Sequence, residues 1–266
     1  MIENLSIAIK AAIKAGNEIM RVYNDPKSDF QVEKKADNSP LTIADKNANE
    51  IITSLLDRTM IPILSEEGKE IPFEERAKWP ELWIVDPLDG TKEFIKKNGE
   101  FTVNIALVRA GVPVLGVIYL PAKQIIYMGV DGVGAFKAEV KNPETIYIVD
   151  EVMGAAIRIP QAQERDNLIV VASRSHLSPE TETYIAKLKE EGKEIDMISS
   201  GSSIKICLVA EGAADVYPRF APTMEWDTAA GHAIARAAGR EIYQADETSP
   251  LVYNKENLLN PWFVVK

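Results

Sequence analysis

Apolar residues recur at helical spacing in two stretches near the start of the chain. In residues 2–24 the apolar positions include Leu5, Ile9 and Ile13, and their spacing predicts a helix with one buried face. A second stretch with the same period predicts a helix over about residues 43–59. Charged residues interrupt the first stretch, so the pattern predicts an amphipathic helix and not a signal peptide.

Short apolar runs predict β-strands at residues 61–64 and 82–85. Each of these two runs leads into acidic residues. If the two strands are parallel neighbours, the acidic side chains converge at one edge of a sheet. A β-rich region follows, with glycine-containing turns between its strands. Its strands are expected at residues 102–108, 112–120, 125–129 and 135–138.

Strands and helices alternate in the C-terminal part of the chain. Strands are expected at residues 168–171, 195–198 and 214–217. Helices are expected after a cap at Ser178, from Gly201 through Leu208, and from Trp226 to about Gly239. Together with the N-terminal part, this alternation predicts an α+β fold with helices layered on two sheets.

A polar, irregular stretch over residues 141–166 separates the two parts and favours a domain boundary near residue 150. We therefore expect an N-terminal α+β domain over residues 1–150, which carries acidic, metal-binding loops. A C-terminal α/β domain over residues 151–266 is expected to complete the substrate site.

The balance of charge narrows the class of partners. The 266 residues include 30 basic and 40 acidic side chains, which gives a formal net charge of −10. This charge repels DNA and RNA and argues against a nucleic acid polymer as a partner. A small anionic substrate remains compatible with it, because a bound metal ion reverses the electrostatic field locally.

The single cysteine, Cys207, cannot form an internal disulfide and lies in an apolar stretch, where we expect a buried, inert thiol. No apolar run approaches the length of a membrane span. These features predict a cytoplasmic protein without integral membrane association. They leave open both peripheral membrane association and the oligomeric state.

Three acidic clusters are the candidates for chemistry. Glu66 and Glu67 follow one predicted strand, Asp86 and Asp89 follow another, and Asp227 lies at the start of a predicted helix. Each cluster has a structural explanation: a solvated pair, an Asp-Gly turn and a helix cap. Carboxylate oxygens are also the ligands that Mg²⁺ prefers. Because two of the clusters follow consecutive apolar strands, their coincidence favours a metal site.

Four motifs resemble those of the inositol monophosphatase superfamily. Residues 86–91 (DPLDGT) are similar to its D-P-[IL]-D-G-T signature, and residues 226–231 (WDTAAG) to its W-D-x-A-[AG]-[AG] signature. Residues 39–45 (SPLTIAD) are similar to its S-P-[LV]-T-x-A-D loop, and the acidic pair lies where the family keeps one. The motifs follow the family's order along nearly the whole chain. The resemblance implies a layered αβαβα sandwich of the sugar-phosphatase type.

The resemblance also implies a Mg²⁺-dependent phosphatase with two or three metal ions, no phosphoenzyme, and inhibition by Li⁺. Its metal ligands would be four carboxylates and one main-chain carbonyl, namely Glu66, Asp86, Leu88, Asp89 and Asp227. Gly90 and Thr91 would contact the scissile phosphate, while Asp45 and Thr91 would orient and deprotonate a water molecule. Substrate binding is further implied for Glu66, Leu88, Asp89 and Asp227.

Four short segments resemble the 3′(2′),5′-bisphosphate nucleotidase, or CysQ-like, branch of the superfamily. They are residues 91–95 (TKEFI), 173–176 (SRSH), 201–205 (GSSIK) and 217–220 (YPRF). By this analogy His176 lies near the adenine, and Ser202, Lys205 and Arg219 hold the nucleotide and its 5′-phosphate. A substrate with two phosphates needs cationic groups for the one that is not cleaved, which supports the analogy.

The leading hypothesis is hydrolysis of the 3′-phosphate of adenosine 3′,5′-bisphosphate to AMP and phosphate, with 3′-phosphoadenosine 5′-phosphosulfate as an open second substrate. An inositol monophosphatase or a broad sugar-phosphate phosphatase is the nearest alternative. A catalytically inactive nucleotide or metal sensor is an alternative of another class. His176 also has an explanation as a loop residue before the Ser178 cap, and Arg219 as a surface salt-bridge residue.

Overall fold

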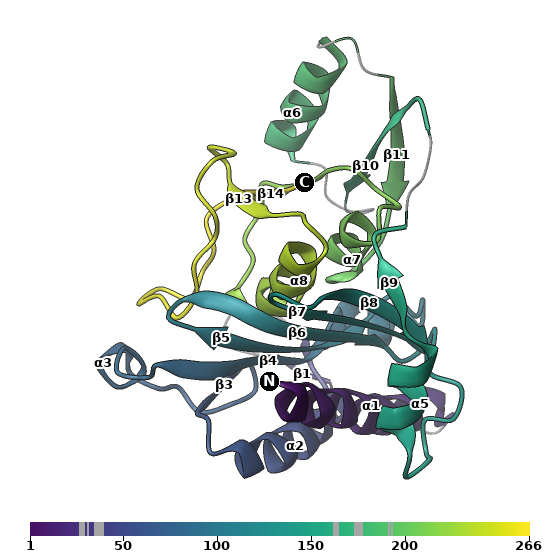
Figure 1. Ribbon diagram of the computed structural model, residues 1–266, viewed down its shortest axis with the longest axis vertical. Helices are drawn as coiled ribbons and strands as arrows, with labels where there is room; N and C mark the ends of the chain where they lie inside the picture. The colour runs from purple at the N-terminus through teal and green to yellow at the C-terminus, as the bar shows by residue number, and fades with distance from the viewer. Residues whose placement is uncertain are drawn as a thin grey trace.

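A computed structural model of the protein describes residues 1–26, 30, 32–34, 40–161, 165–172, 178–190, 192 and 194–266. Helices and sheets alternate in layers along the long axis of the molecule (Figure 1). The expected α+β class and the layered αβαβα arrangement are confirmed.

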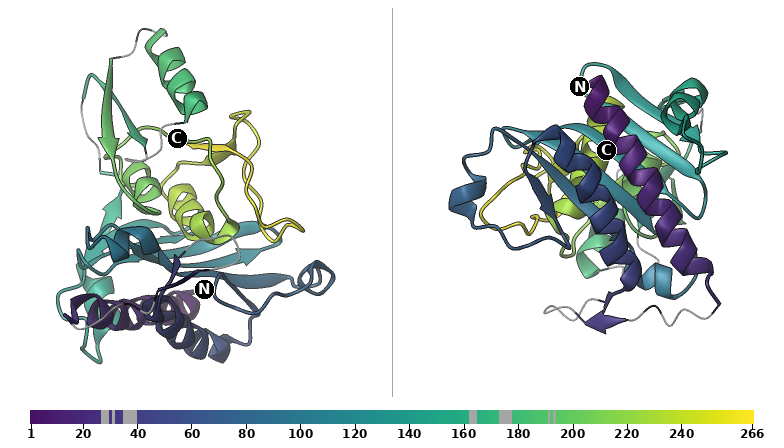
Figure 2. Two further views of the ribbon diagram at one scale, coloured as in Figure 1. Left: turned by 180° about the vertical axis from the view of Figure 1, so that it is seen from behind. Right: turned by 90° about the horizontal axis from the view of Figure 1, so that it is seen from below.

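The first layer consists of α1 (Ile2–Asn24) and α2 (Ile43–Leu56), which lie side by side under the large sheet (Figure 2). Helix α1 buries the apolar stripe that its sequence predicts, and Ile9 and Ile13 are fully buried. Helix α2 begins with a capping box, in which Thr42 and Asp45 satisfy each other's backbone N–H groups. A short 3₁₀ turn (η1, Asp57–Thr59) follows α2, so this predicted helix ends in a tighter coil.

A seven-stranded sheet forms the second layer, in the order β3-β4-β5-β6-β7-β8-β9. Strands β3 and β4 run parallel, with Ser65 opposite Val85, and the other neighbouring pairs are antiparallel. The first two strands are therefore parallel neighbours, which was the condition for their acidic residues to converge. The strand bounds are β3 (Ile63–Ser65), β4 (Glu81–Asp89), β5 (Thr102–Arg109), β6 (Val112–Leu120), β7 (Ile125–Val130), β8 (Gly134–Glu139) and β9 (Ile157–Ile159).

Two sequence-based expectations need correction. Strand β4 does not stop at Val85 but continues through Pro87 to Asp89, because an irregular register between Asp86 and Asp89 accommodates the proline. The stretch 141–166 is not irregular throughout, since it contains α5 (Ile148–Ala155) and β9. Both elements lie at the periphery and bury few side chains, which explains their weak apolar pattern.

The third layer packs α7 (Ile204–Ala210) and α8 (Glu225–Ala237) on the opposite face of the large sheet. Glycines at the sheet surface allow α8 to approach the strands closely. A Cβ atom on Gly116 would lie 2.2 Å from the carbonyl oxygen of Ala230, and one on Gly129 would lie 2.5 Å from the Cα of Ile234. The backbone of α8 therefore lies directly on β6 and β7.

The outer β layer contains two small sheets. One has the order β12-β14-β13, formed by Tyr217–Arg219, Phe263–Val265 and Ile242–Gln244, so that β14 lies in the centre. The other pairs β10 (Leu168–Ala172) with β11 (Ile195–Ser199) in parallel. Strand β12 thus begins later than the expected strand 214–217, although Val216 still bridges to Val170.

Helix α6 (Pro179–Glu190) covers the outer end of the molecule. Ser178 Oγ accepts the N–H of Thr181 at 3.2 Å, which confirms the predicted cap. The remaining elements are a small hairpin, β1 (Glu33–Lys34) with β2 (Pro40–Leu41), and two short helices, α3 (Phe73–Arg76) and α4 (Thr91–Ile95).

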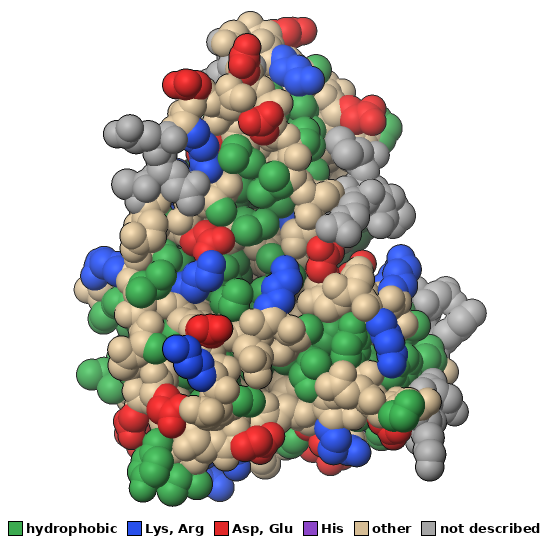
Figure 3. Space-filling model, turned by 90° about the vertical axis from the view of Figure 1, so that its right-hand side faces the viewer, with side chains coloured by type: hydrophobic (Ala, Val, Ile, Leu, Met, Phe, Trp, Pro, Cys, Tyr) green, Lys and Arg blue, Asp and Glu red, His purple; other side chains and the backbone are tan. Residues whose placement is uncertain are grey.

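Cys207 is fully buried in α7, and burial raises the pKa of its thiol well above the ordinary value, as expected of an inert cysteine. Acidic and basic side chains are interspersed on the face shown in Figure 3. Within the described part of the chain, none of the helices combines the length and the apolar character needed to traverse a bilayer.

Candidate active site

Three aspartates from two distant parts of the chain converge above the edge of the large sheet. Asp86 and Asp89 lie on β4, and Asp227 lies in the first turn of α8. One carboxylate oxygen of each lies within 4.8 Å of the others. Asp227 also accepts the N–H of Met224 at 2.8 Å, which fixes its carboxylate at the start of the helix.

The irregular register of β4 explains how Asp86 and Asp89 can face the same point. In a regular strand, residues three positions apart point to opposite faces of the sheet. Here the pairing shifts between Asp86, opposite Asn104, and Asp89, opposite Thr102. The N–H of Leu88 donates to Asp86 Oδ1 at 3.0 Å, and the Leu88 side chain is buried in the core and anchors the bend.

Glu66 joins this cluster from the neighbouring strand. It directly follows β3, and its N–H donates to the carbonyl of Val85 at 3.1 Å, which places it beside β4. Its negative charge contributes to the raised pKa of Asp86. The structure therefore brings together all four carboxylates that the motifs predict.

Burial and mutual repulsion raise the pKa values of these carboxyl groups. The pKa of Asp86 is well above its ordinary value because of burial first and then the charges of Glu66, Asp89 and Asp227. Burial also raises the pKa of Asp227, with Asp89 adding to the shift. Burial raises the pKa of Asp89 to about 6, although Lys205 opposes the shift. Excess buried negative charge on oxygen ligands fits a hard divalent cation.

Thr91 and Asp45 form a hydrogen-bonded pair next to the cluster. Thr91 Oγ1 donates to Asp45 Oδ1 at 3.1 Å and lies 3.3 Å from the Leu88 carbonyl oxygen. The backbone N–H and hydroxyl of Thr42 donate to the other oxygen of Asp45, at 2.8 and 2.5 Å. Asp45 is 1% exposed, and these hydrogen bonds fix the orientation of its carboxylate, with Oδ1 toward Thr91.

Gly90 makes the turn that leads from β4 to Thr91. Its φ angle is +94°, a left-handed conformation that favours glycine. A Cβ atom at this position would lie 3.0 Å from the carbonyl oxygen of Glu100. A side chain at position 90 is therefore disfavoured both by the backbone conformation and by the nearby Glu100 backbone.

A cavity of about 180 Å³ adjoins the acidic cluster. Asp89 and Asp227 form part of its wall, and the loop before α7 and the end of β12 form another part. The residues that matter for its chemistry are Ser202, Lys205, Arg219 and Thr223. Three of these four are the predicted nucleotide contacts, so the structure places them beside the predicted metal ligands.

Lys205 is buried, with 6% of its surface exposed, and donates to the carbonyl oxygens of Ser202 at 2.6 Å and Ser200 at 3.3 Å. Burial lowers its pKa to about 8, while the charge of Asp89 opposes the shift and Arg219 adds to it. Its ammonium group also lies 5.5 Å from the ring centre of Tyr217. Lys205 therefore holds the 200–203 loop as well as adding positive charge to the cavity.

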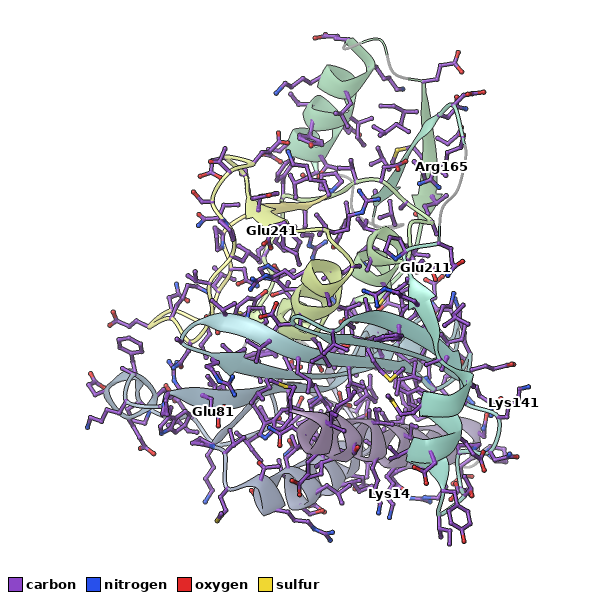
Figure 4. All side chains as sticks on the ribbon, in the orientation of Figure 1. Lys14, Glu81, Lys141, Arg165, Glu211 and Glu241 are labelled. Carbon is purple, nitrogen blue, oxygen red and sulfur yellow. The ribbon has the colours of Figure 1, made fainter. Side chains whose placement is uncertain are left out.

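His176 lies outside the described residues, as does Ser39 of the first motif. The other histidine, His232, is tied into the core on α8. Its ring nitrogens bond to Tyr253, at 2.9 Å, and to Glu241, which Figure 4 labels beside β13. Burial lowers the pKa of His232, so it is a neutral structural residue at physiological pH.

Sequence reasoning missed the residues that support the cluster from behind. Glu225 is fully buried and accepts the N–H groups of Asn254 at 2.6 Å and Lys255 at 3.0 Å, and the Lys255 ammonium at 2.6 Å. Arg76, which is 3% exposed, donates to Asn254 Oδ1 at 2.7 Å and to the Lys255 carbonyl at 3.1 Å. The loop around Lys255 therefore ties the segment after Glu66 to the first turn of α8.

One signal for this support is present in the sequence. Glu225 and Trp226 directly precede Asp227, and a charged residue beside a motif that folds into the core needs a buried partner. The identity of that partner, 30 residues further along the chain, has no local signature.

Comparisons with known proteins agree with this geometry. The model of the inositol monophosphatase family matches residues 2–262. The 3′(2′),5′-bisphosphate nucleotidase CysQ of Escherichia coli K12 is 46% identical over 258 residues, which is 96% of this chain and 96% of that protein.

Solved structures show the same fold. The crystal structure of CysQ from Bacteroides thetaiotaomicron, described as a bacterial member of the inositol monophosphatase family, superposes with a TM-score of 0.91 at 61% identity. It covers 99% of this chain and 97% of that one. The extragenic suppressor protein SuhB of Bartonella henselae gives a TM-score of 0.74 at 26% identity, covering 99% and 93%. The chain belongs to the inositol monophosphatase family.

Proposed function

We propose that the protein is a Mg²⁺-dependent phosphatase that removes the 3′-phosphate from adenosine 3′,5′-bisphosphate and releases AMP and phosphate. The observation that carries this proposal is the position of the cavity that contains Lys205 and Arg219, directly beside the acidic cluster. One phosphate can lie at the carboxylates while a second lies near Lys205 and Arg219. The name of the Escherichia coli relative, 3′(2′),5′-bisphosphate nucleotidase CysQ, supports the same substrate class.

The proposed metal ligands are Glu66, Asp86, Asp89, Asp227 and the Leu88 carbonyl. Together they would bind two or three Mg²⁺ ions. When bound, the metal ions would neutralise phosphate charge and make a water molecule more acidic. The buried carboxylates hold the negative charge that such ions need. Backbone N–H groups at Gly90 and Thr91 would donate to a phosphate oxygen.

The Asp45–Thr91 pair would position and deprotonate the attacking water. The Thr91 hydroxyl donates to Asp45, so its oxygen lone pairs are oriented to accept a hydrogen bond from that water. As the water attacks phosphorus, its proton passes to Thr91 Oγ1 while the Thr91 proton passes to Asp45 Oδ1. The bond between phosphorus and the 3′-oxygen then breaks, the 3′-oxygen keeps the bonding electron pair and takes up a proton from solvent water, and Asp45 returns its proton to solvent. No residue becomes phosphorylated.

Ser202, Lys205 and Arg219 would bind the phosphate that stays on the nucleotide, and His176 would lie near the adenine. Each charge-assisted hydrogen bond that is removed costs on the order of 1.5–3 kcal/mol. Arg219→Ala should therefore raise the KM for adenosine 3′,5′-bisphosphate about ten-fold or more, relative to the KM for adenosine 3′-monophosphate.

Phosphate release from a small substrate panel tests the proposal. With Mg²⁺, adenosine 3′,5′-bisphosphate should be the preferred substrate and 5′-AMP the product. Activity should disappear in excess chelator, return with Mg²⁺ and decrease with Li⁺. The panel should include inositol 1-phosphate, fructose 1,6-bisphosphate and 3′-phosphoadenosine 5′-phosphosulfate.

Each alternative function gives a distinct result in this panel. Preference for inositol 1-phosphate or for the sugar phosphate would replace the nucleotidase proposal by a broader phosphatase. Nucleotide binding without turnover by the intact protein would indicate a sensor. Asp89→Asn should weaken Mg²⁺ binding and abolish turnover, and full activity with chelator present would contradict the metal proposal.

A further inference from the structure

Three buried polar atoms that line the cavity have no hydrogen-bond partner among the described residues. They are Ser202 Oγ, Arg219 Nε and Thr223 Oγ1. Buried polar groups in folded proteins are nearly always paired, because an unpaired one costs about 1–3 kcal/mol. Their convergence on one cavity indicates that a ligand completes them. The sequence motifs account for Ser202 and Arg219, but they give no role to Thr223.

Thr223 is held firmly in place by its backbone. Its carbonyl accepts the N–H of Asn260 at 2.9 Å, and the next residue, Met224, pairs with Leu259. Met224 in turn donates its N–H to Asp227 Oδ2 at 2.8 Å. Thr223 therefore belongs to the same short, hydrogen-bonded segment that positions the Asp227 carboxylate of the acidic cluster.

The chemistry of the unpaired atoms identifies the group they bind. Arg219 Nε can only donate, and the two hydroxyls can donate as well. Three donors next to the Lys205 ammonium fit the oxygens of a phosphate. Asp89, Glu93 and Asp227 also line the cavity and outnumber Lys205 and Arg219, so charge alone does not select an anion there and the neutral hydroxyl donors contribute to its binding.

We propose that Thr223 is a specificity-determining residue, whose hydroxyl donates a hydrogen bond to the phosphate retained on the nucleotide. The inference rests on the proposed function and deepens it. Because Thr223 and Asp227 share one segment, the retained phosphate is held at a fixed position relative to the carboxylates. Substrates with a second phosphate at the right distance gain this contact, and monophosphates do not.

The test compares Thr223→Val, which keeps the shape and removes the hydroxyl, with Thr223→Ser, which keeps the hydroxyl. Thr183→Val on the exposed side of α6 is the matched control. The ratio of kcat/KM for adenosine 3′,5′-bisphosphate to that for adenosine 3′-monophosphate should fall about ten-fold in Thr223→Val. The Kd for 5′-AMP, measured by calorimetry, should rise by a similar factor. Thr223→Ser should keep the kcat/KM ratio and the Kd for 5′-AMP close to those of the wild type.

Three results would overturn the inference. In the first, Thr223→Val binds 5′-AMP as wild type does and keeps the wild-type ratio. In the second, it weakens both substrates equally. In the third, Thr223→Ser is as impaired as Thr223→Val, which would indicate a packing role. If wild type neither binds 5′-AMP nor hydrolyses the bisphosphate, the proposed function itself fails and this inference fails with it.

Discussion

At the scale of single residues, the proposed chemistry depends on the orientation of Thr91 more than on its charge or size. Its hydroxyl is held between Asp45 Oδ1 and the Leu88 carbonyl, so only its lone pairs remain for a water molecule. Thr42 fixes the opposite oxygen of Asp45 with two donors. In the proposed mechanism the Thr91 proton therefore passes along this hydrogen bond to Asp45 Oδ1.

We expect Thr91→Ala to lower kcat by about 10²–10⁴-fold, the usual contribution of a positioned acid–base group. Mg²⁺ affinity should change little, because Thr91 is not one of the proposed ligands. Steady-state kinetics with saturating Mg²⁺ and direct Mg²⁺ titration separate the two effects. Thr91→Ser should retain most of the activity, and a wild-type kcat in Thr91→Ala would remove Thr91 from the mechanism.

Lys205 gives the activity a predictable dependence on pH. Burial lowers the pKa of this lysine to about 8, so the ammonium is charged below about pH 8 and loses its proton as the pH rises through that value. The kcat/KM for adenosine 3′,5′-bisphosphate should therefore decrease above about pH 8, relative to that for adenosine 3′-monophosphate. Lys205→Arg, which stays charged, should remove this decrease. An unchanged pH profile in the variant would show that Lys205 does not act through its charge.

The residues predicted from sequence and those missed differ in a physical way. Asp86, Asp89 and Asp227 lie in short motifs, because local backbone geometry fixes how each side chain points. Arg76 and Thr223 are positioned by hydrogen bonds to segments far along the chain, and such contacts leave no local pattern in the sequence. The roles of the predicted site residues stay predictions, although the structure places those it describes around one acidic cluster.

At the scale of elements, the loop around Lys255 joins two segments that carry proposed metal ligands. Arg76 at the end of α3 binds this loop from one side, and Glu225 at the start of α8 binds it from the other. Arg76 also donates to the Ile71 carbonyl at 3.0 Å, which closes the segment that follows Glu66. The spacing between Glu66 and Asp227 thus depends on this shared loop.

Replacing Arg76 by lysine keeps the charge but loses the fork of donors that spans the loop. We expect Arg76→Lys to lower the free energy of unfolding by about 1–3 kcal/mol, because buried carbonyls lose their partners. Arg109→Lys is the control, since Arg109 pairs with Glu81 near the surface, where an ion pair contributes at most about 1 kcal/mol. Denaturant unfolding measures the loss of unfolding free energy in each variant. Equal losses in the two variants would show that the Arg76 hydrogen bonds do not stabilise the loop around Lys255.

Elements with a strong apolar period were predictable, and those without one were not. The helix over residues 2–24 and the strands from 102 to 139 bury continuous apolar faces, so the pattern fixes their type. Strand β9 buries one of its three residues, and α5 buries only Ile148 and Val152. Strand β4 was predicted too short because Pro87 is an ordinary stop signal, which the local irregularity of the sheet overrides.

At the scale of the whole molecule, the site forms where the layers meet. The proposed division near residue 150 places Asp86 and Asp89 in one part and Asp227, Lys205 and Arg219 in the other. Glu211, which follows α7 and is labelled in Figure 4, accepts Lys137 Nζ at 2.5 Å and the Tyr127 hydroxyl at 3.0 Å. These contacts connect the third layer to strands β7 and β8 of the large sheet.

The contact between α8 and the sheet should be highly sensitive to volume. Gly116→Ala would place a methyl group 2.2 Å from the Ala230 carbonyl, so the helix must move. We expect a loss of about 1–3 kcal/mol or more in unfolding free energy, together with weaker Mg²⁺ binding, since Asp227 moves with α8. Gly154→Ala in α5, which meets nothing within 4 Å, should be neutral or slightly stabilising. If both variants unfold at the same denaturant concentration, the close contact between α8 and the sheet does not make the stability sensitive to an added methyl group.

The central position of β14 has a consequence for biosynthesis. β14 follows every other strand in the order of translation, yet β12 and β13 both pair with it and not with each other. A nascent chain that already contains Arg219 therefore lacks β14, the strand with which β12 pairs. The cavity beside the acidic cluster, which Arg219 and Phe263 both line, cannot form before β14 has been made. Until then the edges of β12 and β13 that pair with β14 stay open, and unpaired strand edges favour aggregation of an unfinished polypeptide.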